Sequence, residues 1–105
     1  MPIIKAGNGI ITQINVFTVP DGGQAALIEY LAAAAKVARE VDGWISASLH
    51  RSLDGTRVVN YAQTVDRDAA RRVIDHLSAK GLIDGNKRFG EAHPGLYEVA
   101  LLFER

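Results

Sequence analysis

Hydrophobic and polar residues alternate most regularly in residues 44–65, on both sides of the dipeptide Asp54-Gly55. A period of two is typical of β-strands, and Asp-Gly favours a type I′ turn, in which both central residues have positive φ. The stretch therefore predicts a β-hairpin with a two-residue loop, and this loop fixes the register of the strands. The facing pairs would be Ile45 with Thr64, Ala47 with Ala62, Leu49 with Asn60, and Leu53 with Thr56.

This register gives the hairpin two faces of different character. The mostly apolar face is expected to pack against helices; it carries Ile45, Ala47, Leu49, Arg51, Val58, Asn60, Ala62 and Thr64. The other face mixes aromatic, aliphatic and small polar side chains; it carries Trp44, Ser46, Ser48, His50, Val59, Tyr61, Gln63 and Val65. Neither face has the composition of one that meets only water.

A strand and a helix are predicted before the hairpin. Residues 10–19 are rich in Ile, Val, Phe and Thr and form the strand. Asp21 and Gln24 have the spacing of a capping box, so a helix is expected to follow and to end at Gly43, a natural C′ residue. Its apolar stripe consists of Leu27, Ile28, Leu31, Ala34, Ala35 and Ala38. The alanines permit either close packing on the sheet or space for a ligand.

A second helix and a last strand are predicted after the hairpin. Asp66 is the expected N-cap of the helix, whose apolar side comprises Ala69, Ala70, Val73, Ile74 and Leu77. Residues 78–94 contain three glycines before a proline, so they predict a long connection with one short helix near residues 86–92. The final strand is expected at residues 96–103.

The order of these elements is β-α-β-β-α-β, which predicts an α+β, ferredoxin-like fold with an antiparallel sheet. Residues 1–9 are expected to be a flexible arm and residues 10–105 a single domain. Helices cover one face of such a sheet, and the face with Trp44 and Tyr61 would stay open. An open face with aromatic and aliphatic side chains predicts a homodimer in which two sheets pack into an α/β barrel.

Composition narrows the class of protein. Of the 105 residues, 48% are hydrophobic, and twelve basic side chains balance twelve acidic ones, so nothing favours binding to nucleic acid or to an anionic membrane. The chain has no cysteine, which excludes disulfides and thiolate chemistry. No signal peptide or membrane-spanning run is apparent, so we expect a cytoplasmic protein.

The serines and histidines of the chain show no catalytic or metal-binding pattern. Neither a nucleophile elbow nor a His-x-x-x-His spacing occurs. Two asparagines are more informative, because asparagine is disfavoured in strands and both Asn15 and Asn60 lie within predicted ones. They either line a pocket between sheet and helices, where they would bind a phenol, an enolate or dioxygen, or satisfy backbone groups at a bulge.

The stretch Gly43–Gln63 strongly resembles the antibiotic biosynthesis monooxygenase domain family, in particular the small enzymes that oxidise anthrone-type aromatic polyketides to quinones. The resemblance lies in the Gly-aromatic strand, the Asp-Gly-Thr turn and the Val-Val-Asn-Tyr-Ala-Gln strand. By pattern it extends over residues 10–103. It implies a dimeric α/β barrel, a pocket between the sheet and the helices of each subunit, and oxygen chemistry without flavin, haem or metal.

Site residues follow from the resemblance position by position. Asn60 matches the pocket asparagine of the Asn-Tyr-Ala-Gln-Trp motif, Asn15 a first-strand asparagine, and His50 a histidine of a relative. Thr64 replaces the tryptophan of that motif, and Ala70 replaces a tyrosine of the second helix. These two replacements are expected to widen the pocket. His76 corresponds to a second-helix histidine that a haem-degrading branch of the superfamily uses.

Three functions are compatible with these observations. The first is a cofactor-independent monooxygenase, an oxidoreductase that acts on a small aromatic or polyketide-like substrate and dioxygen. Asn60 and Asn15 would orient the substrate and stabilise the enolate and superoxide, and His50 would transfer a proton. The second is a dimeric ligand-binding protein that has lost the chemistry. The third is an isomerase or another proton-transfer enzyme on the same fold.

Overall fold

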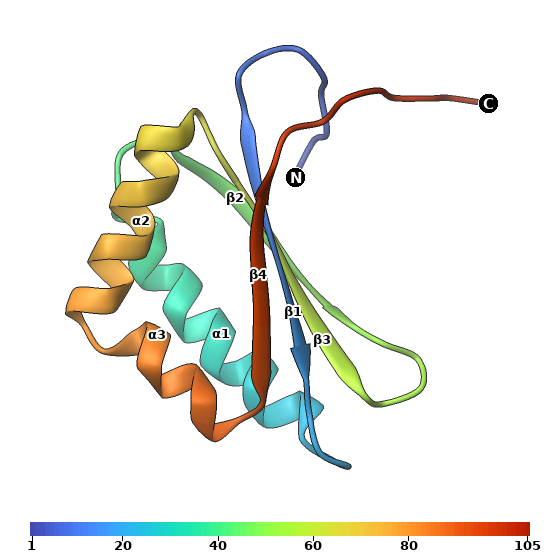
Figure 1. Ribbon diagram of the computed structural model, residues 1–105, viewed down its shortest axis with the longest axis vertical. Helices are drawn as coiled ribbons and strands as arrows, with labels where there is room; N and C mark the ends of the chain where they lie inside the picture. Colours follow the sequence, from blue (N-terminus) through green and yellow to red (C-terminus); the bar gives the residue numbers. More distant parts are fainter.

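The computed structural model describes residues 1–105 as a four-stranded antiparallel sheet with helices on one face (Figure 1). The elements are β1 (Ile11–Thr18), α1 (Gln24–Ala38), β2 (Trp44–Arg51), β3 (Arg57–Thr64), α2 (Arg67–Ala79), α3 (Leu82–Gly85), the 3-10 helix η1 (Asn86–Arg88) and β4 (Glu91–Tyr97). The strands lie in the order β2-β3-β1-β4. The predicted ferredoxin-like order of elements is confirmed. No helix combines the length and the apolar character needed to cross a lipid bilayer.

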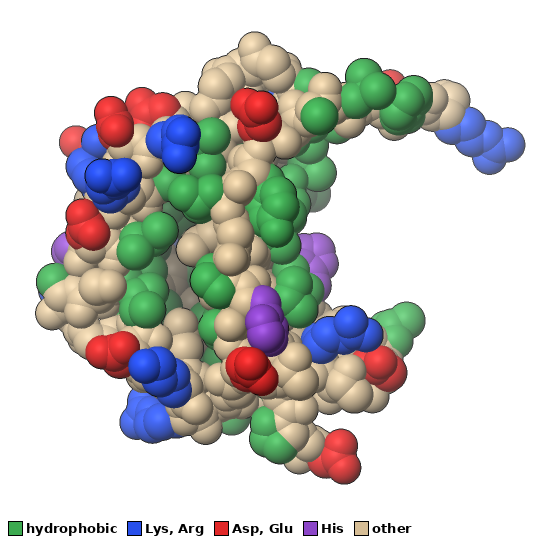
Figure 2. Space-filling model, in the orientation of Figure 1, with side chains coloured by type: hydrophobic (Ala, Val, Ile, Leu, Met, Phe, Trp, Pro, Cys, Tyr) green, Lys and Arg blue, Asp and Glu red, His purple; other side chains and the backbone are tan.

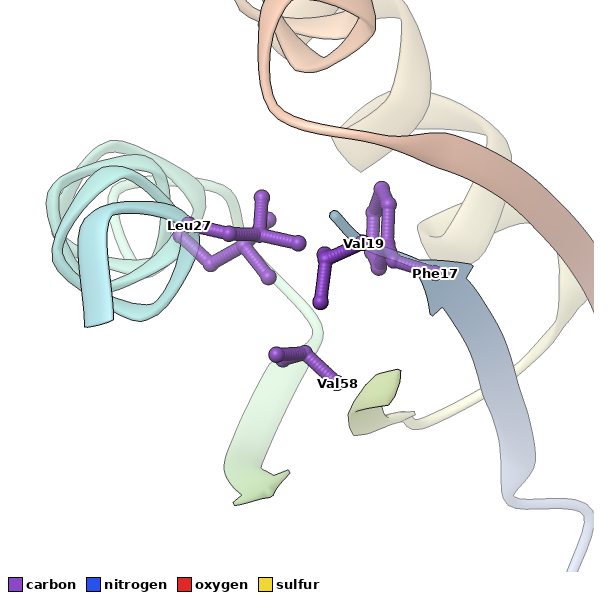
Figure 3. Close-up of a cluster of buried hydrophobic side chains, with 5 residues drawn as sticks. Phe17, Val19, Leu27 and Val58 are labelled. Atoms are coloured by element: carbon purple, nitrogen blue, oxygen red, sulfur yellow. The ribbon is translucent and has the colours of Figure 1, made fainter. Parts of the chain in front are cut away.

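The main core lies between the sheet and α1. Phe17 of β1, Leu27 of α1 and Val58 of β3 have no exposed surface, and their side chains meet in Figure 3. The predicted stripe of α1 is confirmed, because its buried residues are Leu27, Leu31, Ala34 and Ala38. The inward side of α2 is confirmed as well; Ala69, Ala70 and Val73 are buried. The two helices therefore cover the same face of the sheet.

The predicted ends of the helices are only partly correct. The Asp66 carboxylate caps α2 and accepts a hydrogen bond from the Ala69 N–H at 2.8 Å. Helix α1 has Gly23 as its N-cap and no side-chain cap, so the capping box was wrong. The Gln24 amide instead donates to the Ser52 carbonyl at 3.0 Å and ties α1 to the hairpin.

The end of α1 also differs from the prediction. The helix stops at Ala38, and turns follow it, in which the Val41 N–H donates to the Ala38 carbonyl at 3.0 Å. Gly43 is therefore not a C′ residue of the helix. It has φ of +94° and opens β2, and its carbonyl accepts a hydrogen bond from the Val65 N–H at 2.8 Å.

From Ser46 to Arg51 the hairpin has the predicted register, but its turn is different. Leu49 faces Asn60 and Ala47 faces Ala62, as the sequence indicates. The type I′ turn was wrong, because only Gly55 has positive φ (+83°) and the strands already end at residues 51 and 57. The Asp54 carboxylate closes the wider loop, since it accepts hydrogen bonds from the Thr56 hydroxyl at 2.7 Å, the Thr56 N–H at 3.0 Å and the Ser52 hydroxyl at 2.8 Å.

These hydrogen bonds predict an acid-sensitive turn. The Thr56 side chain, followed by the Thr56 backbone and Ser52, lowers the pKa of Asp54 to about 2. Because the pKa of Asp54 is lowered in the folded state, its ionised carboxylate stabilises the fold at pH values above 3.8, the ordinary pKa. This stabilisation is lost as the pH falls from 3.8 toward about 2. The stability advantage of the wild type over Asp54→Asn should therefore shrink across that window. Urea unfolding of both proteins at several pH values measures it; a constant difference would contradict the role of Asp54.

A β-bulge at the start of β2 changes which face its first residues occupy. Trp44 faces Thr64, the next ladder pair is Ser46 with Gln63, and Ile45 is left out. The predicted pairing of Ile45 with Thr64 was therefore wrong. The extra residue places Trp44 on the helix side, where it lines a cavity with Ala62 and Thr64. The assignment of Trp44 to the open face was wrong for the same reason.

The last strand lies earlier in the chain than predicted. β4 spans Glu91–Tyr97 and pairs with β1, whereas the expected strand 96–103 contains no regular structure beyond Tyr97. Proline has no backbone N–H to donate to a neighbouring strand. β4 tolerates Pro94 because it is an edge strand and pairs on one side only. Helical turns occupy residues 82–88 instead of the predicted 86–92. The C-terminal segment, residues 98–105, runs away from the body of the protein (Figure 1).

The sheet face opposite the helices carries Ile14 and Val16 of β1 together with Val59 and Tyr61 of β3, all partly exposed. The N-terminal segment covers one end of this face, where the Gln63 amide donates to the Ile3 carbonyl at 2.9 Å. Most of the face has no helix over it (Figure 1).

Candidate active site

Two adjacent cavities lie between the sheet and the helices. An inner cavity of about 60 Å³ lies beneath the alanines of α1, and an outer cleft of about 650 Å³ opens beside β4. Four residues line both spaces: Gln13, Asn15, Ile83 and Asn86. Figure 2 shows the surface hollowed between the helices and β4, with hydrophobic side chains on both sides. The outer cleft has the size of an ordinary small-molecule site.

The alanines of α1 make the inner cavity possible. Ala34, Ala35 and Ala38 all line it, and each has a short side chain where a larger residue would fill the space. The sequence left close packing and space for a ligand as alternatives. Both apply here, because Ala34 and Ala38 are buried in the interface and also border the cavity.

The two predicted asparagines are direct neighbours in the structure. Asn15 of β1 faces Asn60 of β3 across the ladder, and both side chains line the inner cavity. Directly opposed residues have Cβ atoms about 5 Å apart, so one small ligand can contact both amides. The sequence analysis therefore identified a pair that the fold brings together.

The hydrogen bonding of the two amides differs. The Asn15 Oδ1 atom accepts a hydrogen bond from the His93 N–H of β4 at 3.1 Å, so this amide partly serves the backbone. The Asn60 Oδ1 atom is buried and has no hydrogen-bond partner. An unsatisfied buried acceptor costs about 1–3 kcal/mol. Asn60 thus matches the ligand-binding alternative better than the alternative in which it satisfies backbone groups.

A third asparagine of the site, Asn86, was missed by the sequence analysis. It lies in η1, lines both the inner cavity and the outer cleft, and has a buried Oδ1 atom without a partner. Its sequence context between glycines is typical of a turn, where asparagine is common for local reasons. Only the three-dimensional arrangement shows that it faces the same space as Asn60.

The space beside Thr64 and Ala70 is filled from another strand. These two residues and Trp44 line a gap of only about 10 Å³. The expected widening of the pocket was therefore wrong, because the bulge in β2 places the Trp44 ring against this wall. The Thr64 hydroxyl is also engaged, donating to the Asp66 carbonyl at 3.1 Å. An aromatic wall is present, but Trp44 supplies it.

Neither predicted histidine lies at the cavity. His50 is on the open face of the sheet, where its Nε2 atom is 2.9 Å from the Ser48 hydroxyl. His76 belongs to α2 but lines neither cavity, and its Nε2 atom is 3.2 Å from a Glu40 carboxylate oxygen. No group of three or more His, Cys, Asp or Glu side chains gathers anywhere in the chain.

The inner cavity is polar only through amides and the indole N–H of Trp44. Charged side chains border only the outer cleft, where Lys87 and Glu91 lie at its rim. An amide both donates and accepts hydrogen bonds without carrying charge, and its dipole acts strongly where water is excluded. This arrangement can orient a hydroxyl group or stabilise an oxyanion.

Known proteins are similar to this chain in sequence and in fold. The profile of the family described as Antibiotic biosynthesis monooxygenase matches residues 10–79. The tetracenomycin-F1 monooxygenase of Streptomyces glaucescens is 38% identical over 64 residues, which cover 60% of this chain and 57% of that protein. The match thus spans less than two thirds of that relative's length.

Two crystal structures have similar folds. SnoaB of Streptomyces nogalater, a cofactor-independent oxygenase, superposes with a TM-score of 0.81 at 22% identity, over 92% of this chain and 99% of that one. The ActVA-Orf6 monooxygenase of Streptomyces coelicolor, solved with the ligand nanaomycin D, gives a TM-score of 0.78 at 25% identity, over 90% of this chain and 91% of that one.

Proposed function

This chain belongs to the antibiotic biosynthesis monooxygenase family, and we propose that it is a cofactor-independent monooxygenase of a small aromatic, polyketide-like substrate. The observation that carries the proposal is the pair Asn15 and Asn60, which face one another in a cavity where the Asn60 oxygen lacks a partner. The relatives support it, since SnoaB is a cofactor-independent oxygenase and ActVA-Orf6 binds nanaomycin D.

The reaction converts a ring CH₂ group and dioxygen into a ring C=O group and water. Loss of one proton to solvent gives the enolate, which passes one electron to dioxygen. The resulting radicals combine into a C–O–O⁻ group that takes up one proton from solvent, and cleavage of its O–O bond with loss of water leaves the quinone. One oxygen atom enters the product and the other leaves as water, so the substrate supplies every electron.

The residues of the cavity have distinct parts in this reaction. Asn60 and Asn15 orient the substrate oxygen, and their amide N–H groups stabilise the negative charge of the enolate and superoxide. The outer cleft accommodates the ring system, because about 650 Å³ is enough for it. The inner cavity of about 60 Å³ takes the reacting edge of the ring and dioxygen.

Oxygen uptake tests this function. The purified protein, treated with a chelator, is incubated aerobically with a panel of anthrone-like phenols, and oxygen consumption and quinone formation are followed together. We expect one dioxygen consumed for each quinone formed. Binding without uptake above the protein-free blank across the panel would instead identify a ligand-binding protein.

We also propose that the open sheet face binds a second copy of the chain. Ile14, Val16 and Tyr61 are partly exposed there, and no helix covers them. Val16→Lys should convert a dimer into a monomer, because it places a charge within an apolar interface. Asp75→Lys, on the exposed side of α2, is the matched control. Sedimentation equilibrium measures the mass; a wild-type monomer at micromolar concentration would contradict the proposal.

A further inference from the structure

We propose that Asn86 determines substrate specificity, with its amide oxygen accepting a hydrogen bond from a second hydroxyl group of the substrate. The inference rests on the proposed function and narrows its substrate class. The site would prefer an aromatic compound with two free hydroxyl groups over the corresponding methyl ether. One hydroxyl would bind at Asn60 and the other at Asn86.

The first step is the chemistry of the two unpartnered atoms. The Oδ1 atoms of Asn60 and Asn86 are both buried, and no donor of the chain reaches either. A carbonyl oxygen accepts hydrogen bonds, so the group that satisfies it must be a donor. Thr12 also has an unpartnered buried oxygen, but it alternates with Gln13 and so lies on the other face of the sheet.

The second step is the position of Asn86 relative to Asn60. Asn60 belongs to β3 in the sheet, whereas Asn86 belongs to η1 beyond α2, so the two amides come from different walls of the inner cavity. Asn86 also lines the outer cleft. A ligand that enters from the cleft and reaches Asn60 therefore passes Asn86, and two hydroxyl groups on one ring system can meet both oxygens.

The third step is the fixed position of Asn86. The hydroxyl of Tyr30 on α1 donates to the Leu82 carbonyl at 2.7 Å, and the Tyr30 and Phe89 rings have centroids 4.9 Å apart. Gly85, next to Asn86, lies directly against the Tyr30 ring, so a side chain there would clash with it. These contacts hold the segment on both sides of Asn86. A rigidly placed acceptor discriminates between donors and non-donors better than a mobile one.

Binding measurements with non-reactive probes test the inference independently of turnover. The ligands are a dihydroxynaphthalene, its monomethyl ether and its dimethyl ether, and dissociation constants are measured by calorimetry. The wild type should bind the diol about tenfold more tightly than the monomethyl ether, since one hydrogen bond is lost. Asn86→Leu should bind both compounds about equally, because no acceptor remains.

Two further variants make the experiment decisive. Asn86→Ser retains a hydrogen-bond acceptor and should keep part of the preference for the diol. It therefore tests the inference even if the larger side chain in Asn86→Leu disturbs the fold. Asn8→Leu, the same substitution at an exposed asparagine of the N-terminal segment, should keep all of it. An unchanged preference in Asn86→Leu, or a wild type that does not prefer the diol, would overturn the inference.

The two proposals fail separately. If the preference depends on Asn86 but no phenol supports oxygen uptake, the monooxygenase is refuted and the specificity of the site stands. If oxygen uptake occurs and the preference does not depend on Asn86, the monooxygenase stands and the inference about Asn86 is refuted.

Discussion

Replacing Asn60 with alanine is expected to lower the rate of substrate-dependent oxygen uptake by about 100-fold, the usual effect of removing one donor that stabilises a developing negative charge. The inner cavity contains no charged side chain, so the side-chain amides are the groups that can provide this stabilisation. Asn15 remains in Asn60→Ala, and its amide N–H group, which lines the same cavity, accounts for the activity that is left. The loss should fall mainly on kcat if Asn60 acts in the transition state.

The control for Asn60→Ala is Asn8→Ala, which removes an exposed asparagine side chain that lines neither cavity. It should leave oxygen uptake unchanged. The melting temperature of Asn60→Ala should stay close to that of the wild type, because the Asn60 oxygen makes no hydrogen bond in the folded protein. A folded Asn60→Ala protein with wild-type activity would refute the site, although membership of the family would be unaffected.

The asparagine pair could be predicted from the sequence because strand alternation is a local property. Leu49 and Asn60 face one another in the structure as the hairpin predicts, and this fixes the side of the sheet on which Asn60 lies. Asn15 is an asparagine inside a strand, where this residue type is disfavoured, which marks it without any knowledge of its neighbours. Their direct opposition required the pairing of β1 with β3, which only the whole fold provides.

The misplaced elements have non-local causes. A bulge moves Trp44 to the helix side, and nothing in the alternation of residues 44–51 indicates an extra residue. Pro94 and two nearby glycines suggest a connection, yet they fit a strand that is paired on one side only. Asn86 resembles an ordinary turn residue until the chain folds over the cavity. Each error depends on packing partners that are distant in sequence.

Gly43→Ala is expected to destabilise the fold by about 3 kcal/mol, through two effects that add. Gly43 has φ of +94°, which costs a residue with a side chain about 1–2 kcal/mol. An added Cβ atom would also lie 2.6 Å from the Ala69 Cβ atom of α2, and such overpacking typically costs about 1–3 kcal/mol. Urea unfolding measures the loss.

Gly55→Ala separates the two effects. Gly55 has a similar φ of +83° but no atom within 4 Å of an added Cβ, so only the backbone cost of about 1–2 kcal/mol applies. Equal losses in both variants would show that α2 does not pack against Gly43. Because Gly43 directly precedes Trp44, the only tryptophan of the chain, Gly43→Ala should also change the fluorescence of the folded protein, and Gly55→Ala should not. The glycine at position 43 thus allows α2 to approach the residue that precedes the aromatic wall of the cavity.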